Sequence, residues 1–319
     1  MKTVEIANLS RNYGSRRGIS NINLSIEKGE IFGFLGPNGS GKSTTIRVLM
    51  GLLKAGSGTA RIFGKDCWND GPAIRRDVGY VAGDVRLYPW LTVRLALSML
   101  SKIRGMKDLR KSGMVLVDSF RLEPDLPFRK MSRGNRQKVA LLLALAHSPE
   151  LILLDEPTSG LDPLMQDTLM TCLRELAAKG HTVMISSHTI SEVETLCDHI
   201  AIVRDGRIVE DSTVDRLQAR APRQILVTLR PDQGIESVRW PNDISICHLP
   251  EKNGAPFRSL TTTPIPSARL DRTCVLELIG SSASFVVWAA GQNFADIMIQ
   301  PPSLEMLFRP YYQVNQEAS

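Results

Sequence analysis

The segment GPNGSGKS, from Gly36 to Ser43, constrains this chain more than any other stretch. It fits the pattern G-x-x-x-x-G-K-S, with the apolar run IFGFL before it and the helical pattern KSTTIRVLMGLL overlapping its end. In such a strand–loop–helix unit the glycines let backbone N–H groups surround phosphates at the positive end of the helix. A plain surface turn would not need the whole motif and both flanks. The segment therefore predicts a binding site for a purine nucleoside triphosphate.

Two residues at the end of this loop carry side-chain chemistry. Lys42 can reach the β- and γ-phosphates, and the Ser43 hydroxyl can ligate Mg²⁺. The loop as a whole is predicted to bind the nucleotide, which adds the residues Gly36, Pro37, Asn38, Gly39, Ser40, Gly41 and Thr44.

Polar residues also follow two later apolar runs. Asp155 ends the run LILLD and is placed to hold Mg²⁺, directly or through water, while Glu156 beside it can activate a water molecule against the γ-phosphorus. His188, in ISSH, follows the next predicted strand and should emerge at the same edge of the sheet. There it can contact the γ-phosphate or orient the water. A lone histidine after a strand is more often structural, so the predicted catalytic role of His188 depends on this placement.

The order of predicted elements indicates an α/β fold with two domains. Strands and helices alternate over residues 1–218, which predicts a three-layer domain around a largely parallel sheet, interrupted by a helical subdomain at about 84–149. Residues 219–319 contain short strands and two helical segments, which predict a small α+β domain. The Pro-, Ser- and Thr-rich residues 250–271 are predicted to form an exposed loop.

The composition is that of an ordinary globular protein. Of 319 residues 43% are hydrophobic, and the net charge of +6 permits an acidic partner without requiring one. Five cysteines without a C-x-x-C pair argue against a disulfide framework or a zinc site. The apolar runs are shorter than the roughly 18–20 residues of a membrane span. We therefore expect a soluble chain that another protein holds at any membrane where it works.

The motifs GPNGSGKST, MSRGNRQ, LILLDEPTSGLD and ISSH, in this order, resemble those of the ATP-binding subunit of an ABC transporter. The resemblance covers about residues 1–218. It implies the P-loop NTPase fold, with a RecA-like core and an antiparallel β-subdomain beside the helical subdomain. It also implies that the nucleotide is ATP with Mg²⁺, and that Tyr13 stacks on the adenine.

In this family a signature sequence, LSGGQ, begins a helix and binds the γ-phosphate of ATP held by the opposite subunit. In this chain the corresponding residues are Ser132, Arg133, Gly134 and Asn135. Ser132 is a good N-cap and the helix start is an anion site on physical grounds, although a solvated basic helix start would also explain the cations. The resemblance implies that hydrolysis requires a second ATP-binding subunit, as in a homodimer. It also identifies the D-loop, which joins the two sites, as Ser159, Gly160, Leu161 and Asp162.

The chain departs from the family pattern in two places. Arg133 and Asn135 replace a glycine and the glutamine of the signature. In addition, the Q-loop of the family places a glutamine near the Mg²⁺ and the membrane partner, whereas this chain has Gly83 there. Asp84 can substitute for that glutamine, or water can fill its place.

The signature, the glutamine-less loop and the C-terminal PPSLEMLFRPYY resemble ATPases of drug, antibiotic and polysaccharide exporters. The resemblance implies an integral-membrane permease on a separate chain, a peripheral location at the cytoplasmic face of the membrane, and no nucleic-acid partner. An importer ATPase or a regulatory subunit of low activity remains open as an alternative. A soluble ABC ATPase of translation or DNA repair fits less well, because the chain has one phosphate loop and no long coiled coil between its motifs.

Overall fold

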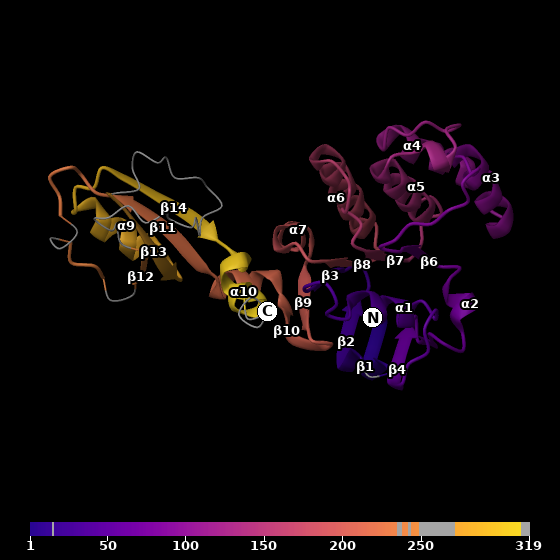
Figure 1. Cartoon of the computed structure of the whole chain (residues 1–319), viewed down its shortest axis with the longest axis horizontal. Coiled ribbons are helices and arrows are strands. Elements are labelled where there is room, and N and C mark those ends of the chain that lie inside the picture. Colours follow the sequence, from indigo (N-terminus) through magenta and orange to yellow (C-terminus); the bar gives the residue numbers. More distant parts are fainter. Residues whose placement is uncertain (15, 235–237, 242–243, 249–271, 314–319) are drawn as a thin grey trace. The chain divides into compact units, whose positions relative to one another are not determined.

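The computed structural model describes residues 1–14, 16–234, 238–241, 244–248 and 272–313. The chain divides into two compact units, Met1–Val214 and Asp215–Ser319 (Figure 1). The predicted domain boundary at residue 218 stays a prediction, and the predicted loop at 250–271 lies outside the described residues.

A six-stranded sheet forms the centre of the first unit. Its order is β10-β9-β3-β8-β7-β6, and all its strands run parallel except β10, which pairs antiparallel with β9. Every residue of β3, β7 and β8 is buried, as expected for strands covered on both faces. The strands are β3 (Ile31–Leu35), β6 (Val78–Val81), β7 (Leu151–Asp155), β8 (Thr182–Ser187), β9 (His199–Arg204) and β10 (Arg207–Thr213).

A second, antiparallel sheet covers one face of this centre. It has the order β2-β1-β4-β5, and its strands are β1 (Lys2–Tyr13), β2 (Arg16–Glu27), β4 (Ser57–Ile62) and β5 (Lys65–Asp66). The helix α1 (Lys42–Leu49) contacts β4 and β7 and therefore joins the two sheets. Ile22 of β2, Ile46 of α1 and Phe34 of β3 belong to one buried core. The predicted antiparallel β-subdomain is thus present.

Helices cover the other face and one edge of the central sheet. α6 (Pro163–Ala178) packs on β8, and α7 (Ile190–Leu196) packs on β3 so closely that a Cβ atom at Gly33 would lie 2.0 Å from Val193. The connection from β6 to β7 holds the predicted helical subdomain, which Figure 1 shows gathered at one end of the unit. Between these two strands lie the helices α3 (Val93–Arg104), α4 (Leu109–Ser119), the 3₁₀ helix Phe128–Lys130 and α5 (Arg133–Leu145), and a short helix α2 (Gly71–Ile74) precedes β6.

The strands β9 and β10 form a hairpin. Its two-residue turn consists of Asp205 and Gly206, which have φ angles of 49° and 76°. Two positive φ angles are what the tight turn between right-twisted strands requires.

The second unit is an antiparallel sheet with helices, which agrees with the predicted small α+β domain. Its strand order is β12-β13-β11-β14, and its core contains Ile225, Leu276 and Phe285. Within the described ranges, no helix of the chain combines the length and the apolar character of a membrane span. The elements from the end of β10 onwards are α8 (Val214–Arg220), β11 (Pro222–Thr228), β12 (Ile244–His248), β13 (Thr273–Ile279), α9 (Ala283–Ala290), β14 (Asp296–Pro302) and α10 (Leu304–Gln313).

Candidate functional site

The predicted phosphate loop connects β3 to α1. Gly39 and Gly41 have φ angles of 81° and 109°, in the left-handed region that favours glycine. A Cβ atom at Gly41 would lie 2.6 Å from Cγ2 of Ile19, so this position excludes larger residues on steric grounds as well. No side chain caps the first turn of α1 and no acidic residue lies in it. The N–H groups of a helix start of this kind favour an anion.

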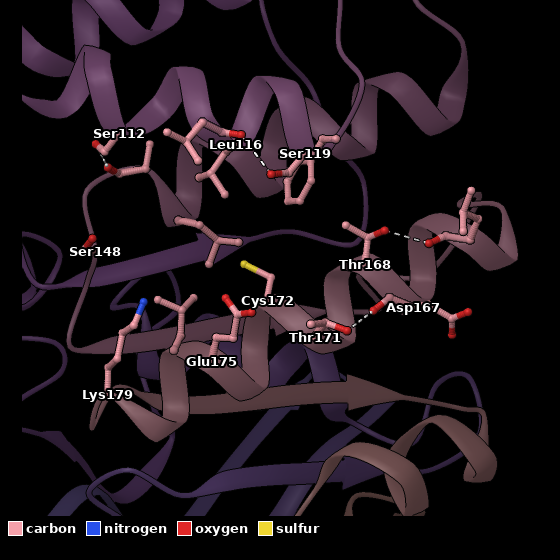
Figure 2. Close-up of a pocket in the computed structure, with 16 residues that line it drawn as sticks. Ser112, Leu116, Ser119, Ser148, Asp167, Thr168, Thr171, Cys172, Glu175 and Lys179 are labelled. Atoms are coloured by element: carbon pink, nitrogen blue, oxygen red, sulfur yellow. Dashed lines mark hydrogen bonds between the residues drawn. The ribbon is translucent and has the colours of Figure 1, made fainter.

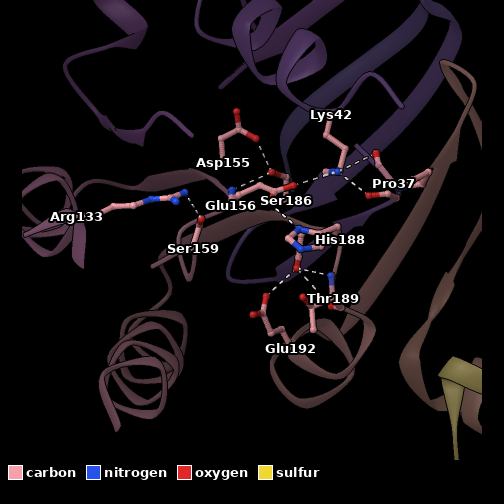
Figure 3. Close-up of polar contacts among 12 residues, drawn as sticks. Pro37, Lys42, Arg133, Asp155, Glu156, Ser159, Ser186, His188, Thr189 and Glu192 are labelled. Atoms are coloured by element: carbon pink, nitrogen blue, oxygen red, sulfur yellow. Dashed lines mark hydrogen bonds and ion pairs between the residues drawn. The ribbon is translucent and has the colours of Figure 1, made fainter. Parts of the chain in front are cut away.

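Lys42 is the cation of this loop, and it is almost completely buried, with 4% of its side chain exposed. Its Nζ atom donates hydrogen bonds to the carbonyl oxygens of Gly36, at 2.6 Å, and Pro37, at 3.2 Å. It also lies 3.3 Å from Oε1 of Glu156. The loop therefore holds its own lysine in position and pairs it with the predicted catalytic carboxylate (Figure 3).

Glu156 lies between two partners from neighbouring strands. Its other carboxylate oxygen, Oε2, is 2.7 Å from Nδ1 of His188. These residues meet because β8 lies between β3 and β7 in the sheet, so the carboxyl ends of three adjacent parallel strands deliver Lys42, His188 and Glu156 to one edge. The backbone of Glu156 has a φ of 50°, which is uncommon for a residue other than glycine. Sequence reasoning placed His188 at this edge, and the structure brings it to Glu156.

Asp155 and Ser43 are the residues predicted to hold Mg²⁺. Asp155 is buried, and its Oδ1 atom accepts a hydrogen bond of 2.6 Å from the Ser186 hydroxyl. A carboxylate and a serine hydroxyl are the hard oxygen ligands that Mg²⁺ takes. The buried Oγ of Ser40, in the same loop, has no hydrogen-bond partner, as expected where a polar ligand is to be bound. These residues therefore fit a magnesium–triphosphate group.

Ser186 is a residue that sequence reasoning missed. Besides holding Asp155, its Oγ accepts a hydrogen bond of 3.2 Å from the backbone N–H of Glu156. It thus supports both acidic residues (Figure 3). The only signal in the sequence is its place in the run ISSH, because the register that pairs Asp155 with Ser186 cannot be read from the sequence.

The residue proposed to stack on adenine lies beside the phosphate loop. The hydroxyl of Tyr13 is 3.4 Å from Oγ1 of Thr44, and the ring is partly exposed at the end of β1. Its role toward adenine stays a prediction.

The signature and D-loop residues lie beside one another. Ser132 is the N-cap of α5, and its hydroxyl accepts a hydrogen bond of 3.2 Å from the N–H of Asn135, which confirms the predicted cap. Asp162 caps α6 in the same way, through a 2.9 Å bond from the N–H of Met165. Leu161 is buried. How these segments act on a nucleotide stays a prediction.

At the Q-loop position, Gly83 lies against the predicted Mg²⁺ ligand. A Cβ atom built on Gly83 would be 3.5 Å from Oδ2 of Asp155, so an added methyl group would be in ordinary van der Waals contact. Asp84 is exposed and pairs with Arg86, at 2.7 Å. Its carboxylate is therefore engaged with an arginine on the surface.

A cavity of about 650 Å³ lies elsewhere, between α4 and α6 (Figure 2). Leu116 of α4 and Cys172 of α6 are among the residues that line it, and none of the predicted site residues does. The candidate nucleotide site, formed by loops at the sheet edge, is thus separate from this cavity.

Comparisons with known proteins agree with this picture. A family model described as "ABC transporter" matches residues 19–159. The bacitracin transport ATP-binding protein BcrA of Bacillus licheniformis is 36% identical over 219 residues, which cover 68% of this chain and 72% of that protein. The linearmycin resistance ATP-binding protein LnrL of Bacillus subtilis is 28% identical over 309 residues, which cover 96% of each chain.

A solved structure shares the fold. The dimeric structure of MJ0796, a bacterial ABC transporter cassette, superposes with a TM-score of 0.61 and 27% identity, over 66% of this chain and 98% of that one. The expected P-loop NTPase fold is therefore confirmed.

Proposed function

The chain belongs to the family of ABC transporter ATP-binding proteins, and we propose from this premise that it powers the export of a drug-like or antibiotic-like compound. It binds and hydrolyses ATP, as the family does. The direction of transport rests on its similarity to proteins named for bacitracin transport and linearmycin resistance. The observation that carries the enzymatic part is the placement of Glu156 between Lys42 and His188.

Different residues of the phosphate loop and of β7 would bind the phosphates of ATP and the Mg²⁺ ion. Lys42 and the N–H groups at the start of α1 would hold the β- and γ-phosphates, while Ser43 and Asp155 would hold the metal. When bound, Mg²⁺ would supply positive charge that neutralises the phosphates during the reaction. Ser186 keeps the Asp155 carboxylate oriented for this task.

Glu156 serves as the base. In the structure its carboxylate is paired with the Lys42 ammonium, so the phosphates of ATP compete for the same cation. Once Lys42 turns to the phosphates, the carboxylate is released to accept the proton of a water molecule. His188, hydrogen-bonded to the other oxygen of the carboxylate, orients this base. General-base help of this kind is typically worth about 10²- to 10⁴-fold in rate.

Two copies of the chain would complete each site. The start of α5, with Ser132, Gly134 and Asn135, would bind the γ-phosphate of ATP held by the other copy. The dimeric state of the structurally similar cassette supports this arrangement. The positive end of α5 supplies an anion site without any further group.

An exposed aromatic surface supports a docking site for the membrane partner. Tyr88 and Trp90 stack with ring centroids 5.4 Å apart, although 65% and 54% of these side chains are exposed. Leu95, Met99 and Ile103 of α3, in the same helical subdomain, are exposed as well. Exposed aromatic residues of this kind are typical anchors of protein interfaces. We assign this surface to a permease on a separate chain, which would hold the protein at the cytoplasmic face of the membrane.

Affinity capture from detergent-solubilised native membranes tests the transporter assignment. The bait is the full chain with Glu156→Gln, kept with ATP and Mg²⁺, and we expect a stoichiometric multi-span membrane protein. Capture of ribosomal or nucleic-acid proteins instead would contradict it. The ATPase activity of the captured complex is then compared between the parent and Glu156→Gln. If the two rates are equal, Glu156 is not the base, and the chain is better explained as a regulatory subunit.

The direction of transport is tested in the native cell. We expect Glu156→Gln to raise sensitivity to at least one compound of an antibiotic panel. Unchanged sensitivity to the panel, together with a new requirement for an external nutrient, would favour an importer.

A further inference from the structure

The start of α5 is attached to the segment that follows Glu156 by three contacts. The buried Gln137 donates a hydrogen bond of 3.0 Å from Nε2 to the carbonyl oxygen of Pro157. Gly134 approaches so closely that a Cβ atom there would lie 2.7 Å from the carbonyl oxygen of Gly160. Arg133 donates a hydrogen bond of 3.0 Å from Nη2 to the hydroxyl of Ser159 (Figure 3). The signature and the D-loop of one chain are therefore in direct contact.

The side chain of Arg133 contributes to this contact along its whole length. A Cβ atom on Gly160 would lie 3.4 to 3.5 Å from Cγ, Cδ and Nε of Arg133, so the arginine stem covers Gly160. Gly160 has a φ of 80°, a conformation that glycine adopts without strain. The arginine thus packs over the D-loop and hydrogen-bonds to it at the same time.

The positive charge of Arg133 does not stabilise α5, the helix to which it belongs. It is the first residue of α5, where the positive end of the helix disfavours a cation. Ser132 caps this helix, and Gln137 and Gly134 already fix its start against the neighbouring segment. The contact with Ser159 is the favourable interaction that the structure shows for this guanidinium.

The segment that Arg133 holds begins at the proposed base. The N–H of Ser159 donates a hydrogen bond of 3.2 Å to the carbonyl oxygen of Glu156, which closes a tight turn. Within this turn Glu156 has its uncommon φ of 50°. A contact that fixes Ser159 therefore also limits the motion of the backbone that carries the Glu156 carboxylate.

We propose that Arg133 is a positioning residue that fixes the D-loop of its own chain, and that it acts through Ser159 and not by touching the ATP of the other copy. This inference rests on the proposed function, since it concerns how the ATP-bound dimer is assembled. Arg133 stands where the family signature has a glycine, and the proposal assigns it a role within its own protomer.

Hydrogen exchange on the nucleotide-free full chain tests the contact itself. Arg133→Gln and Ser159→Ala should each raise exchange of the amides in residues 158–162 by roughly three- to tenfold, the effect of one lost hydrogen bond. The double variant should show no further rise. Lys130→Gln removes a nearby cation as a control and should leave this exchange unchanged. Unchanged exchange in Arg133→Gln would overturn the proposal.

Dimerisation distinguishes positioning from direct phosphate contact. In the Glu156→Gln background with ATP, Arg133→Gln should weaken the dimer roughly three- to tenfold, and it should have no effect once Ser159→Ala is present. Equal weakening with and without Ser159→Ala would mean that Arg133 touches phosphate, and would overturn the proposal. If the Glu156→Gln parent does not dimerise with ATP, the proposed function fails, and hydrogen exchange still decides whether Arg133 fixes the D-loop.

Discussion

Oε1 of Glu156 lies 3.3 Å from Nζ of Lys42, so the proposed base and the proposed phosphate-binding cation form an ion pair between the loops that follow β7 and β3. Because of this pairing, we expect substitutions of the two residues to have opposite effects on ATP affinity. Lys42→Ala should weaken ATP binding roughly 10- to 100-fold, because a charge-assisted contact to phosphate is lost. Glu156→Gln should bind ATP at least as tightly as the parent, because its amide no longer competes for Lys42.

Titration with a fluorescent ATP analogue, at matched Mg²⁺, measures both affinities. Unfolding temperatures of the two variants within a few degrees of the parent would show that the loops remain folded. Weaker binding in Glu156→Gln than in the parent would contradict the competition between carboxylate and phosphate.

Ser186→Ala should raise the Mg²⁺ concentration needed for half-maximal ATPase activity roughly tenfold or more. The reason is that Oδ1 of the buried Asp155 loses its 2.6 Å hydrogen bond. Ser187→Ala is a matched control on the same strand, because the Ser187 hydroxyl donates to Glu192, at 2.7 Å, and not to Asp155. Equal Mg²⁺ dependence in the two variants would argue against a supporting role for Ser186.

Gly41→Ala should destabilise the first unit by about 1–3 kcal/mol more than Gly39→Ala. Both positions have positive φ angles, but a Cβ atom at Gly41 would meet Ile19 at 2.6 Å, whereas nothing lies within 4 Å of one at Gly39. Calorimetric unfolding of the nucleotide-free chain compares them. A smaller loss for Gly41→Ala would show that Ile19 can move aside.

Trp90→Ser should weaken binding of the membrane partner by about 30-fold, the effect of losing an aromatic anchor worth about 2 kcal/mol. ATP binding by the isolated chain should not change, because Trp90 is not among the nucleotide-site residues. Trp68→Ser is the control, since Trp68 is also half exposed but packs under Lys54 in a different part of the unit. Equal losses of partner with both variants would mean that the aromatic surface is not the docking site.

The pH dependence of stability should include a contribution from His147. Burial, and then the nearby charge of Arg104, lower the pKa of this imidazole from 6.5 to about 4. As pH falls below 6.5 the unfolded chain therefore binds a proton that the folded chain does not, and stability is lost progressively between about pH 6.5 and pH 4. Above this window the contribution is constant.

Unfolding temperatures at pH 7.5 and pH 5, compared between the parent and His147→Gln, measure this contribution. The parent should lose more stability on acidification than the variant, whatever their difference at pH 7.5. An equal loss in both would assign the acid sensitivity to other groups.

Much of the site could be predicted from the sequence because it is built from contiguous motifs on successive strands. The position of Lys42 could be predicted from local sequence alone, because its loop lies between an apolar strand and a helix. Glu156 and His188 follow from the rule that parallel strands end at one edge. The α/β fold follows from the alternation of strands and helices, and the helical subdomain from the stretch where this alternation gives way to helical periodicity.

Other contacts depend on the pairing register of strands and on close approaches of the backbone, which cannot be read from the order of residues. Ser186 reaches Asp155 only because β7 and β8 pair at that register, and Arg133 reaches Ser159 only because Gly134 lets two backbones come together. The packing of Gly83 against Asp155 likewise becomes visible only when two distant loops meet.

The strand order of the central sheet has a consequence for how such a protein can evolve. The helical subdomain is inserted between β6 and β7 at one edge, while the second unit continues from β10 at the other edge. The strands β3 and β8 lie between these two points of attachment, and β7, which precedes the proposed base, borders the insertion. Surface loops of these two appendages that lie away from the start of α5 can therefore be lengthened without altering the loops that carry Lys42, Glu156 and His188.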